Sequence, residues 1–318
     1  MKIFAGLLLG TLLLWGIETF VPAASIEVNG TAKDMVLRGD KLVIGTDRGH
    51  IEVFDAKRFT RMEMIAIPNV KDFMGDEIPA RVLSTDLFEG RYLLLSDSGK
   101  GGYSDLYIFE NGKLEKLLNA DDKKALIKAR FVDKDHILLG YLSDEVSLFD
   151  IRVKKEKYRT QLSESKFSDF QLNEDRTQAV FACESGVLSL VDVQTGKFLK
   201  HLEGLNVDNV YKVDFKNGTV SAAGQDRRGA IYDVSTGKGS YIKGDFLIYA
   251  TALSPSARKV AFAMDEQNNI SVYNTFSKVK TAYLKGQKST LNVIIFADEN
   301  RLFSASDDNT VLVWDLEK

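Results

Sequence analysis

Cysteine, histidine and proline are scarce in this chain, which contains one cysteine, three histidines and four prolines among 318 residues. A single thiol cannot form an internal disulfide, so packing must hold the fold together. His50, His136 and His201 stand far apart in the sequence and show no paired metal-ligand spacing. No CxxCH motif is present for covalent haem attachment. We therefore expect neither a metal nor another cofactor.

An excess of positive charge is also missing, since the formal net charge is −3. This balance predicts no bulk attraction to nucleic acid or to anionic lipid. The lone thiol, Cys183, lies in an apolar run that we predict to be a strand. Unpaired cysteine is usually a small core residue, so we expect Cys183 to be buried. A reactive or intermolecular thiol is the alternative.

Only one long hydrophobic run is present, the uncharged segment Ile3–Ile17. Its roughly 15 residues are fewer than the ~20 that a membrane-spanning helix needs. Small residues follow at Pro22–Ser25, as at a signal-peptidase site. We predict that residues 1–25 are an export signal cut between Ala23 and Ile26, which leaves no stable membrane insertion. An uncleaved membrane anchor is the alternative.

Short runs of β-branched and aromatic residues fill the rest of the chain, most clearly near its end. Leu291–Phe296, Arg301–Ser304 and Thr310–Asp315 are separated by polar turns such as Asp307–Asn309. This pattern predicts three antiparallel strands joined by tight turns. Three strands cannot bury both of their faces, so this unit needs neighbours.

The same unit recurs along the chain, each time ending on an aromatic or apolar residue followed by an acid or amide. The steps between the second members of these pairs are 55, 40, 42, 41, 41 and 41 residues. A period near 41 residues with about four strands per unit is typical of a β-propeller. We therefore predict an all-β, seven-bladed β-propeller over residues 26–318. The seven pairs are Phe54-Asp55, Phe109-Glu110, Phe149-Asp150, Val191-Asp192, Tyr232-Asp233, Tyr273-Asn274 and Trp314-Asp315.

The last unit lacks an outer strand because the chain ends on its third strand. The alternating segment Ser25–Val28, followed by the turn Asn29-Gly30, can supply that strand and join the two chain ends. Closure removes an exposed strand edge, which would favour aggregation. The first unit is predicted as Asp34–Arg38, Lys41–Gly45, Ile51–Asp55 and Arg61–Ala66, and the first strands of units 3 to 7 as Lys128–Val132, Phe167–Leu172, Val210–Phe215, Tyr249–Leu253 and Asn292–Phe296.

The second unit is the longest, with insertions at Lys71–Glu77 and Ser96–Gly102. Ser98-Gly99-Lys100 lacks the Ser or Thr and the following helix that a phosphate-binding loop requires, so a hairpin loop is predicted. The sequence shows no catalytic triad and no close pair of carboxylates. We therefore expect no enzyme.

The segment Val311–Asp315, preceded by Ser304–Asp308, resembles the WD40 repeat family. The resemblance covers the chain after residue 25, although only the last unit carries the literal Trp-Asp pair. Gly286-Gln287 stands where that family usually has Gly-His. The family's buried Asp–His–Ser–Trp hydrogen-bond relay therefore does not carry over unchanged.

Four longer sequence segments carry a closer resemblance: Lys71–Ala80, Asn206–Gly218, Ala223–Arg228 and Gly286–Asn292. They are similar to the NapL family, WD40-like periplasmic propellers associated with the periplasmic nitrate reductase of epsilonproteobacteria. That resemblance implies a periplasmic location and an accessory role in nitrate respiration. It also implies a protein partner from the nitrate reductase system. The family has no established catalytic residues, so none is assigned.

Charged and polar side chains gather in the segments that lead into the first strands, which in a propeller surround the channel at one end. One interpretation is a structural network, with Arg130 and Arg81 bonded to Asp169 and Asp208, that holds the blades in register. The other is a recognition rim for a protein partner. The candidate rim residues are Asp76, Glu77, Arg81, Arg130, Asp169, Asp208, Asn209, Tyr249 and Lys288.

Two functional hypotheses follow. The first is a non-catalytic periplasmic scaffold that supports the nitrate reductase system through protein–protein contacts, which a rigid ring makes without an ordering cost. The second is a propeller enzyme of lactonase or quinoprotein type that uses the central channel. The lack of clustered histidine and cysteine favours the first.

Overall fold

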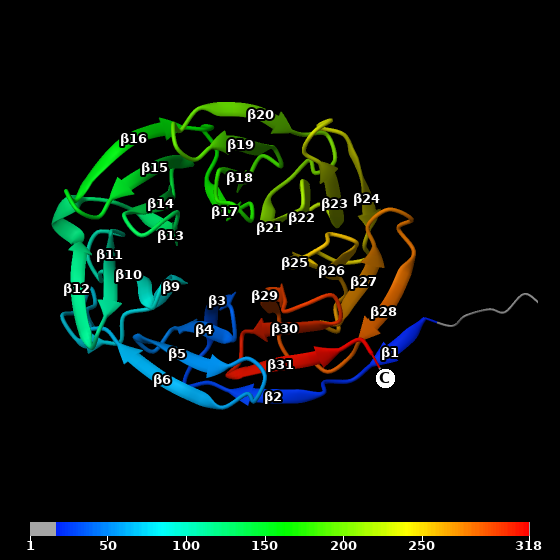
Figure 1. The fold of residues 1–318 in the computed structure, drawn as a ribbon, viewed down its shortest axis with the longest axis horizontal. Helices are drawn as coiled ribbons and strands as arrows, with labels where there is room; N and C mark the ends of the chain where they lie inside the picture. Colours follow the sequence, from blue (N-terminus) through cyan, green and yellow to red (C-terminus); the bar gives the residue numbers. More distant parts are fainter. Residues whose placement is uncertain (1–16, 318) are drawn as a thin grey trace, which may run out of the picture.

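Seven β-sheets surround a central channel in the computed structural model, which describes residues 17–317 (Figure 1). Each sheet is one blade, and the blades follow one another in chain order. The predicted all-β, seven-bladed β-propeller is therefore confirmed. Residues 1–16 of the predicted export signal lie outside the described residues, and the signal stays a prediction. No helix in the described part of the chain is long and apolar enough to cross a bilayer.

In blades 1 to 6 the chain runs from the innermost strand outward, and consecutive strands are antiparallel. The predicted strands of the first unit and the predicted first strands of units 3 to 7 are all present, with ends shifted by two residues or fewer. Blade 1 consists of β3 (Ala32–Arg38), β4 (Lys41–Thr46), β5 (His50–Asp55) and β6 (Arg61–Ala66); blade 2 of β9 (Val82–Phe88), β10 (Arg91–Asp97), β11 (Ser104–Glu110) and β12 (Lys113–Leu118); blade 3 of β13 (Leu126–Phe131), β14 (His136–Tyr141), β15 (Glu145–Asp150) and β16 (Lys155–Gln161). Blade 4 consists of β17 (Phe167–Leu172), β18 (Gln178–Cys183), β19 (Leu188–Asp192) and β20 (Phe198–Leu202); blade 5 of β21 (Val210–Lys216), β22 (Thr219–Gly224), β23 (Arg228–Asp233) and β24 (Gly239–Lys243); blade 6 of β25 (Ala250–Leu253), β26 (Lys259–Ala263), β27 (Ile270–Asn274) and β28 (Lys280–Leu284). A 3-10 turn, η1 (Ala120–Asp122), joins blades 2 and 3.

Blade 7 is built from both ends of the described chain. Its strand order is β2-β31-β30-β29, with β2 (Ala24–Glu27) as the outer strand. The amide of Val28 donates to the carbonyl of Asn309 at 2.9 Å, and Ile26 is buried in the same apolar cluster as Phe303. The predicted closure by an N-terminal strand is therefore confirmed. The other strands of the blade are β29 (Leu291–Phe296), β30 (Arg301–Ser306) and β31 (Thr310–Asp315).

A further strand, β1 (Glu18–Phe20), pairs in parallel with β28 and extends blade 6 to five strands. The sequence did not indicate it, because it directly follows the apolar run that reads as an export signal. Phe20 is buried in the same cluster as Trp314. Pro22 packs closely on the loop after blade 6, since a Cβ atom added at Gly286 would lie 2.8 Å from the proline ring. This segment is therefore part of the folded ring.

The repeated pair of an aromatic and an acid has a clear structural role. The first member lies at the end of the third strand and is largely buried, and in five of the seven pairs the second caps the turn that follows. The other two, Glu110 and Asp315, pair with Arg91 and Arg301. Asp55 accepts the backbone amides of Lys57 and Arg58 at 2.9 and 2.8 Å, and Asn274 caps its own turn in the same way. Short side chains that bond to the backbone two or three residues further on favour turns. This capping explains why the repeat keeps an acid or an amide at this position.

Candidate functional site

The seven inner strands begin at the same end of the channel, which we name the front face. The segments leading into these strands meet there with the turns between second and third strands, because strand direction alternates within a blade. Asn29 and Thr31, which precede β3, therefore lie beside Asp47 of the β4–β5 turn and Asn309 of the β30–β31 turn. Seven of the nine candidate rim residues lie in the segments that lead into these strands, whereas Arg130 and Asp169 lie within β13 and β17.

Arg81 is exposed on the front face and is paired within its own blade. Its side-chain Nε donates to Asp97 Oδ2 at 2.8 Å, and its backbone amide donates to Asp97 Oδ1 at 3.1 Å. The predicted pairing of Arg81 with Asp208 is wrong, because Asp208 instead accepts the amide of Asn209. Arg81 binds Asp97 because Asp97 ends β10, which lies beside the start of β9.

Arg130 lies in the channel wall, where only 2% of it is exposed. Its guanidinium donates to both carboxylate oxygens of Asp34, at 2.8 and 3.0 Å, and to the hydroxyl of Ser84 at 2.6 Å. The predicted pairing of Arg130 with Asp169 is therefore wrong. A two-point guanidinium–carboxylate contact is among the strongest polar interactions in proteins. Here it joins blade 3 to blade 1 across blade 2.

Asp169 is buried as well and binds a different cation. Lys128 donates to Asp169 Oδ1 at 2.5 Å, and the backbone amide of Val213 donates to Oδ2 at 3.0 Å. Burial lowers the pKa of Lys128 to about 8, aided by the positive charges of Arg130 and Lys212 and opposed by Asp169. Arg130 and Asp169 thus contribute to the wall of the ring instead of to its exposed rim.

Carboxylates link neighbouring blades in a repeated manner. An aspartate on one inner strand accepts a backbone amide from the inner strand of the next blade at several junctions. Buried carboxylates need such partners, because an unpaired buried charge is costly. The structural network expected from the sequence therefore exists, although with different pairs. The contacts are Asp34 with Thr85, Asp86 with Phe131, Asp169 with Val213 and Asp214 with Leu253, at 2.8, 3.0, 3.0 and 2.8 Å.

The Asp34–Arg130 pair makes stability depend on acid pH. Burial alone would raise the pKa of Asp34, but Arg130 and Lys128 outweigh it and lower that pKa to about 2. Because the ordinary value is 3.8, the stabilisation is complete above that pH and is lost as pH falls toward 2. The full contribution is about 2 kcal/mol, of which about half is lost at pH 3.

We therefore expect the difference in unfolding free energy between the wild type and Asp34→Asn to be about 1 kcal/mol smaller at pH 3 than at pH 6. Urea unfolding of both proteins at the two pH values measures this difference. Groups that titrate equally in both proteins cancel in the comparison. A difference that stays constant between these pH values would contradict the assignment.

The last blade contains a buried hydrogen-bond relay in which glutamine stands where WD40 repeats have histidine. The indole Nε1 of Trp314 donates to Ser304 Oγ at 2.8 Å, and that hydroxyl donates to Gln287 Oε1 at 2.7 Å. The Nε2 of Gln287 then donates to Ser306 Oγ at 2.6 Å. A glutamine amide offers both an acceptor and a donor. The relay is thus kept in a modified form.

We expect Gln287→Leu to lower the free energy of unfolding by about 1–3 kcal/mol, because it leaves Ser304 and Ser306 without buried partners. Chemical denaturation measures this loss, provided that the unfolding free energy depends equally steeply on denaturant concentration in both proteins. Gln267→Leu is the matched control, since Gln267 is exposed and its side chain makes no hydrogen bond in the described part of the chain. Equal denaturation midpoints for the two variants would show that the relay does not contribute to stability.

Several rim candidates lie near the front mouth of the channel. Tyr249 stacks on Tyr211 with ring centroids 5.4 Å apart, and Asn209 Oδ1 accepts a hydrogen bond from Ser168 at 2.9 Å. Lys288 is exposed on the loop that leads into β29, but it lies beside β2 at the edge of blade 7. The structure therefore brings Tyr249 and Asn209 toward the channel and leaves Lys288 apart from them.

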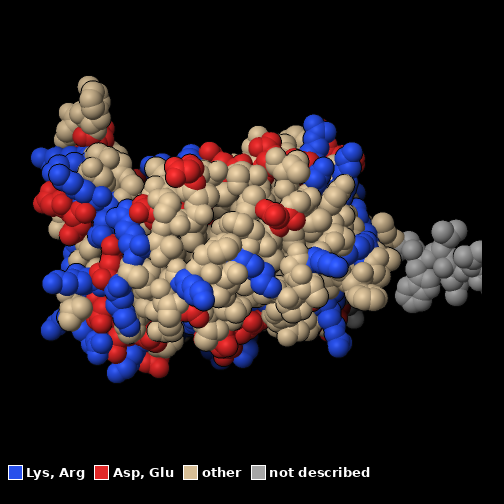
Figure 2. All heavy atoms as spheres, turned by 90° about the horizontal axis from the view of Figure 1, so that it is seen from above, with Lys and Arg blue, Asp and Glu red and all other residues tan. Residues whose placement is uncertain are grey.

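Asp76 and Glu77 belong to a small hairpin formed by β7 (Val70–Lys71) and β8 (Glu77–Ile78), within the first predicted insertion. The carboxylate of Asp72 accepts the amides of Met74 and Asp76 and so closes the tip. Phe73 and Met74 at the tip are 97% and 77% exposed. Figure 2 shows the disc edge-on, with one projection whose uncharged tip stands off an end face on the side of blade 2.

The second predicted insertion, a hairpin loop as expected, supports the base of the first. Gly99 has a positive φ of 68°, and a Cβ atom there would lie 2.3 Å from the carbonyl oxygen of Lys71. Only glycine satisfies both the backbone conformation and this close approach. The β7–β8 hairpin is therefore held in place against blade 2 and is not a free loop.

The three histidines and the cysteine are not part of the β7–β8 hairpin. His50, His136 and His201 belong to blades 1, 3 and 4, and hydrogen bonding to Glu52 raises the pKa of His50. Between residues 17 and 317, no group of three or more histidine, cysteine, aspartate or glutamate side chains is arranged to hold a metal ion. Cys183 is buried, as predicted.

Blade number, strand order and the Trp314 relay together define a WD40-like seven-bladed β-propeller. Its channel wall is held by buried ion pairs, and its front face carries an exposed hairpin. A scan against protein-family models finds no match, and a search of curated proteins finds no similar sequence.

Proposed function

We propose that this protein is a non-catalytic periplasmic scaffold that binds a component of the periplasmic nitrate reductase system through its front face. The observation that carries this proposal is the exposed apolar tip of the β7–β8 hairpin. Phe73 and Met74 form the tip, and the acidic side chains of Asp76 and Glu77 lie next to them. Exposed aromatic and methionine side chains next to charged residues are favourable anchors for a protein partner.

The position of the hairpin supports the same proposal. It is held at its base by the loop containing Gly99, and it belongs to a ring whose ends are joined in blade 7. An interface built on such a preorganised surface loses little conformational entropy on association. Arg81, which follows the hairpin, and Asp208 and Tyr249, at the entries to blades 5 and 6 on the same face, offer further polar contacts.

The placement of the resemblance to the NapL family supports the choice of partner. All four sequence segments that carry this resemblance lie on the front face or in strands that start there. Lys71–Ala80 forms the hairpin, and Gly286–Asn292 leads into β29. Asn206–Gly218 leads into and includes β21, and Ala223–Arg228 forms the β22–β23 turn. A shared partner would constrain this face in particular.

Co-purification from nitrate-grown cells of the source organism tests the proposal. The tagged protein should enrich a periplasmic nitrate reductase subunit, and the double variant Phe73→Ser, Met74→Ser should lower that enrichment at least about tenfold, the effect of 1.4 kcal/mol. Phe276→Ser is the matched control, because Phe276 is equally exposed, at 95%, on the β27–β28 turn of blade 6. All three proteins should melt at the same temperature, since none of the changes touches the core.

Two results would contradict the scaffold. One is the absence of any reductase component from the wild-type purification, and the other is equal enrichment by the wild type and the hairpin variant. The competing hypothesis, a channel enzyme of lactonase or quinoprotein type, predicts a metal or a quinone in the native protein. Elemental analysis and an absorption spectrum of the same preparation measure both.

A further inference from the structure

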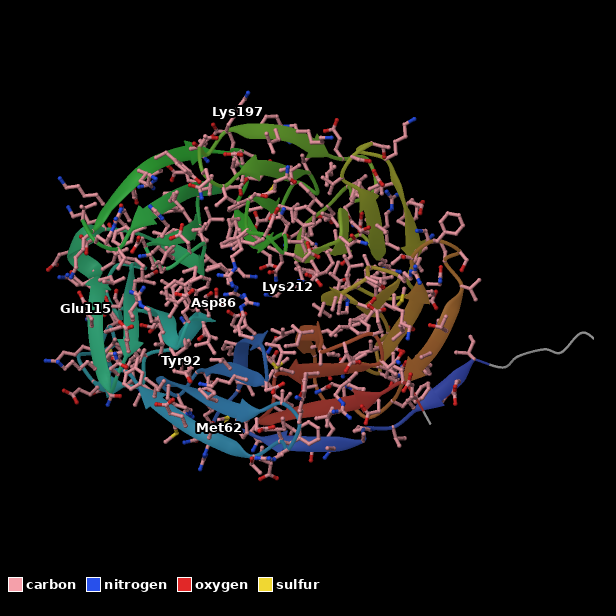
Figure 3. The ribbon with its side chains drawn as sticks, viewed as in Figure 1. Met62, Asp86, Tyr92, Glu115, Lys197 and Lys212 are labelled. Carbon is pink, nitrogen blue, oxygen red and sulfur yellow. The ribbon has the colours of Figure 1, made fainter. Side chains whose placement is uncertain are left out.

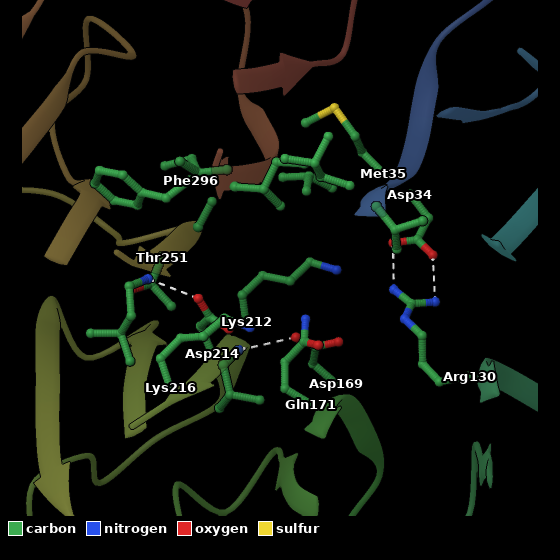
Figure 4. A pocket seen from close by; sticks show the side chains of 18 of the residues that line it. Asp34, Met35, Arg130, Asp169, Gln171, Lys212, Asp214, Lys216, Thr251 and Phe296 are labelled. Carbon is green, nitrogen blue, oxygen red and sulfur yellow. Dashed lines mark hydrogen bonds and ion pairs between the residues drawn. The ribbon is translucent and has the colours of Figure 1, made fainter. Parts of the chain in front are cut away.

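The wall of the central channel carries more positive than negative side chains. A cavity of about 110 Å³ lies within the channel, and its lining includes five basic and three acidic residues (Figure 4). The basic residues come from blades 1, 3 and 5. They are Arg38, Lys128, Arg130, Lys212 and Lys216.

The acidic side chains of this lining already have partners. Asp34 and Asp169 bind Arg130 and Lys128, and Asp214 accepts a backbone amide from blade 6. Arg38 is also paired, with Asp86 just outside the cavity.

Lys212 and Lys216 differ from the other basic residues. Neither ammonium group has a hydrogen bond or an ion pair with another residue between positions 17 and 317. Lys216 nevertheless interacts with the buried carboxylate of Asp214, because its charge opposes the rise that burial causes in the pKa of Asp214. Lys212 is therefore the least compensated cation of the cavity.

Lys212 occupies the central place. In Figure 4 it extends from β21 into the cavity, toward the Asp34–Arg130 pair. It also lines the wider front mouth of the channel together with Tyr211 and Tyr249. Lys212 therefore lines both the front mouth and the cavity.

The electrostatics of the cavity favour an anion. Lys212 adds to the positive charge that lowers the pKa of Lys128, so these groups repel each other. Such repulsion is strong where protein replaces water, and an anion placed between the cations removes it. A lysine ammonium is a compact point charge that suits phosphate-like groups.

We propose that the channel is a binding site for a small inorganic oxyanion, held by Lys212 with Lys216 and Lys128 adding to the positive field. The cavity has room for several water molecules, and therefore for an ion of the size of phosphate or sulfate. This site is separate from the hairpin that carries the proposed function. The hairpin variant should therefore leave anion binding unchanged.

Isothermal titration calorimetry of the full chain with inorganic phosphate tests the site. We expect one saturable site per chain, with at least tenfold weaker binding by Lys212→Gln and several-fold weaker binding by Lys216→Gln. Lys212→Arg keeps the charge and should bind within about threefold of the wild type. The control is Lys197→Gln, which should bind like the wild type, because Lys197 lies on the outer edge of the ring whereas Lys212 faces the channel (Figure 3).

The proposal is overturned if the wild type shows no saturable phosphate binding, or if Lys212→Gln binds as tightly as the wild type. The wild-type titration and its dependence on salt test the proposal even if a variant does not fold. Because the site is electrostatic, phosphate affinity must fall as sodium chloride is raised. Affinity that is independent of salt would also overturn the proposal.

Discussion

A chain shortened to begin at Thr31 should lose about 3–6 kcal/mol of unfolding free energy relative to a chain that begins at Ala23. The missing segment is β2 with its flanks, in which Ile26 and Val28 are only 2% and 4% exposed. Burying each of these side chains contributes about 1.5–3 kcal/mol. Urea unfolding followed by circular dichroism gives the difference between the two chains. The shortened chain should also aggregate, because the edge of β31 is left unpaired.

Point variants in the full-length chain test the packing of β2 without shortening the chain. Ile26→Ala should cost about 2–5 kcal/mol, since it removes most of a buried side chain. Glu27→Ala in the same strand should stay within about 0.5 kcal/mol of the wild type, because Glu27 is exposed. Identical unfolding midpoints for the Thr31 and Ala23 chains would show that the ring does not need β2.

Arg130→Ala should lower the free energy of unfolding by about 3–5 kcal/mol, the second large effect that we expect. The change leaves the carboxylate of Asp34 buried without its cation, and it also removes a donor from Ser84. Removing one partner of a buried pair costs more than the pair itself contributes. Chemical denaturation of the wild type and the variant measures the loss.

The matched control is Arg152→Ala, which removes a pair between Arg152 and Asp150 in which the arginine side chain is 64% exposed. Asp150 is largely buried but keeps the backbone amides of residue 152 and Val153 as donors, and its arginine partner is in solvent, so this variant should lose only about 0–1 kcal/mol. The double variant Asp34→Ala, Arg130→Ala should regain part of the loss, because no lone charge remains in the wall. Equal losses for Arg130→Ala and Arg152→Ala would contradict the role of the channel pair.

The blades could be predicted because each is specified locally. An apolar third strand ends on an acid or amide that caps its own turn, as Asp55 and Asn274 do, so the repeat is visible in sequence alone. The closing strand followed from the same logic, since a blade with three strands has an open edge. β1 escaped prediction because its three residues adjoin the apolar run at the start of the chain.

The partners in the channel could not be predicted from the period. A repeat of about 41 residues places Arg130 and Asp169 on neighbouring inner strands, which suggested that they pair. In the ring, Arg130 instead binds Asp34, which is 96 residues away on blade 1. Lys128, two residues before Arg130, takes Asp169. The curvature of the closed ring decides these contacts, and no local signal encodes it.

The hairpin and the relay could be predicted only in part from the sequence. The insertion Lys71–Glu77 was identified, but β7 and β8 have two residues each, too few to show an alternating pattern. Gln287 was seen to replace a histidine. That its amide bonds to both Ser304 and Ser306 depends on the packing of blade 7.

Hydrogen exchange, measured by mass spectrometry on the full-length protein, tests most directly whether both chain ends form blade 7. The amide of Val28 donates to Asn309, and β2 is paired along its length with β31. Peptides containing residues 26–28 should therefore exchange as slowly as peptides from β30 and β31. Exchange of residues 26–28 at the rate of an unstructured peptide would contradict the closed ring.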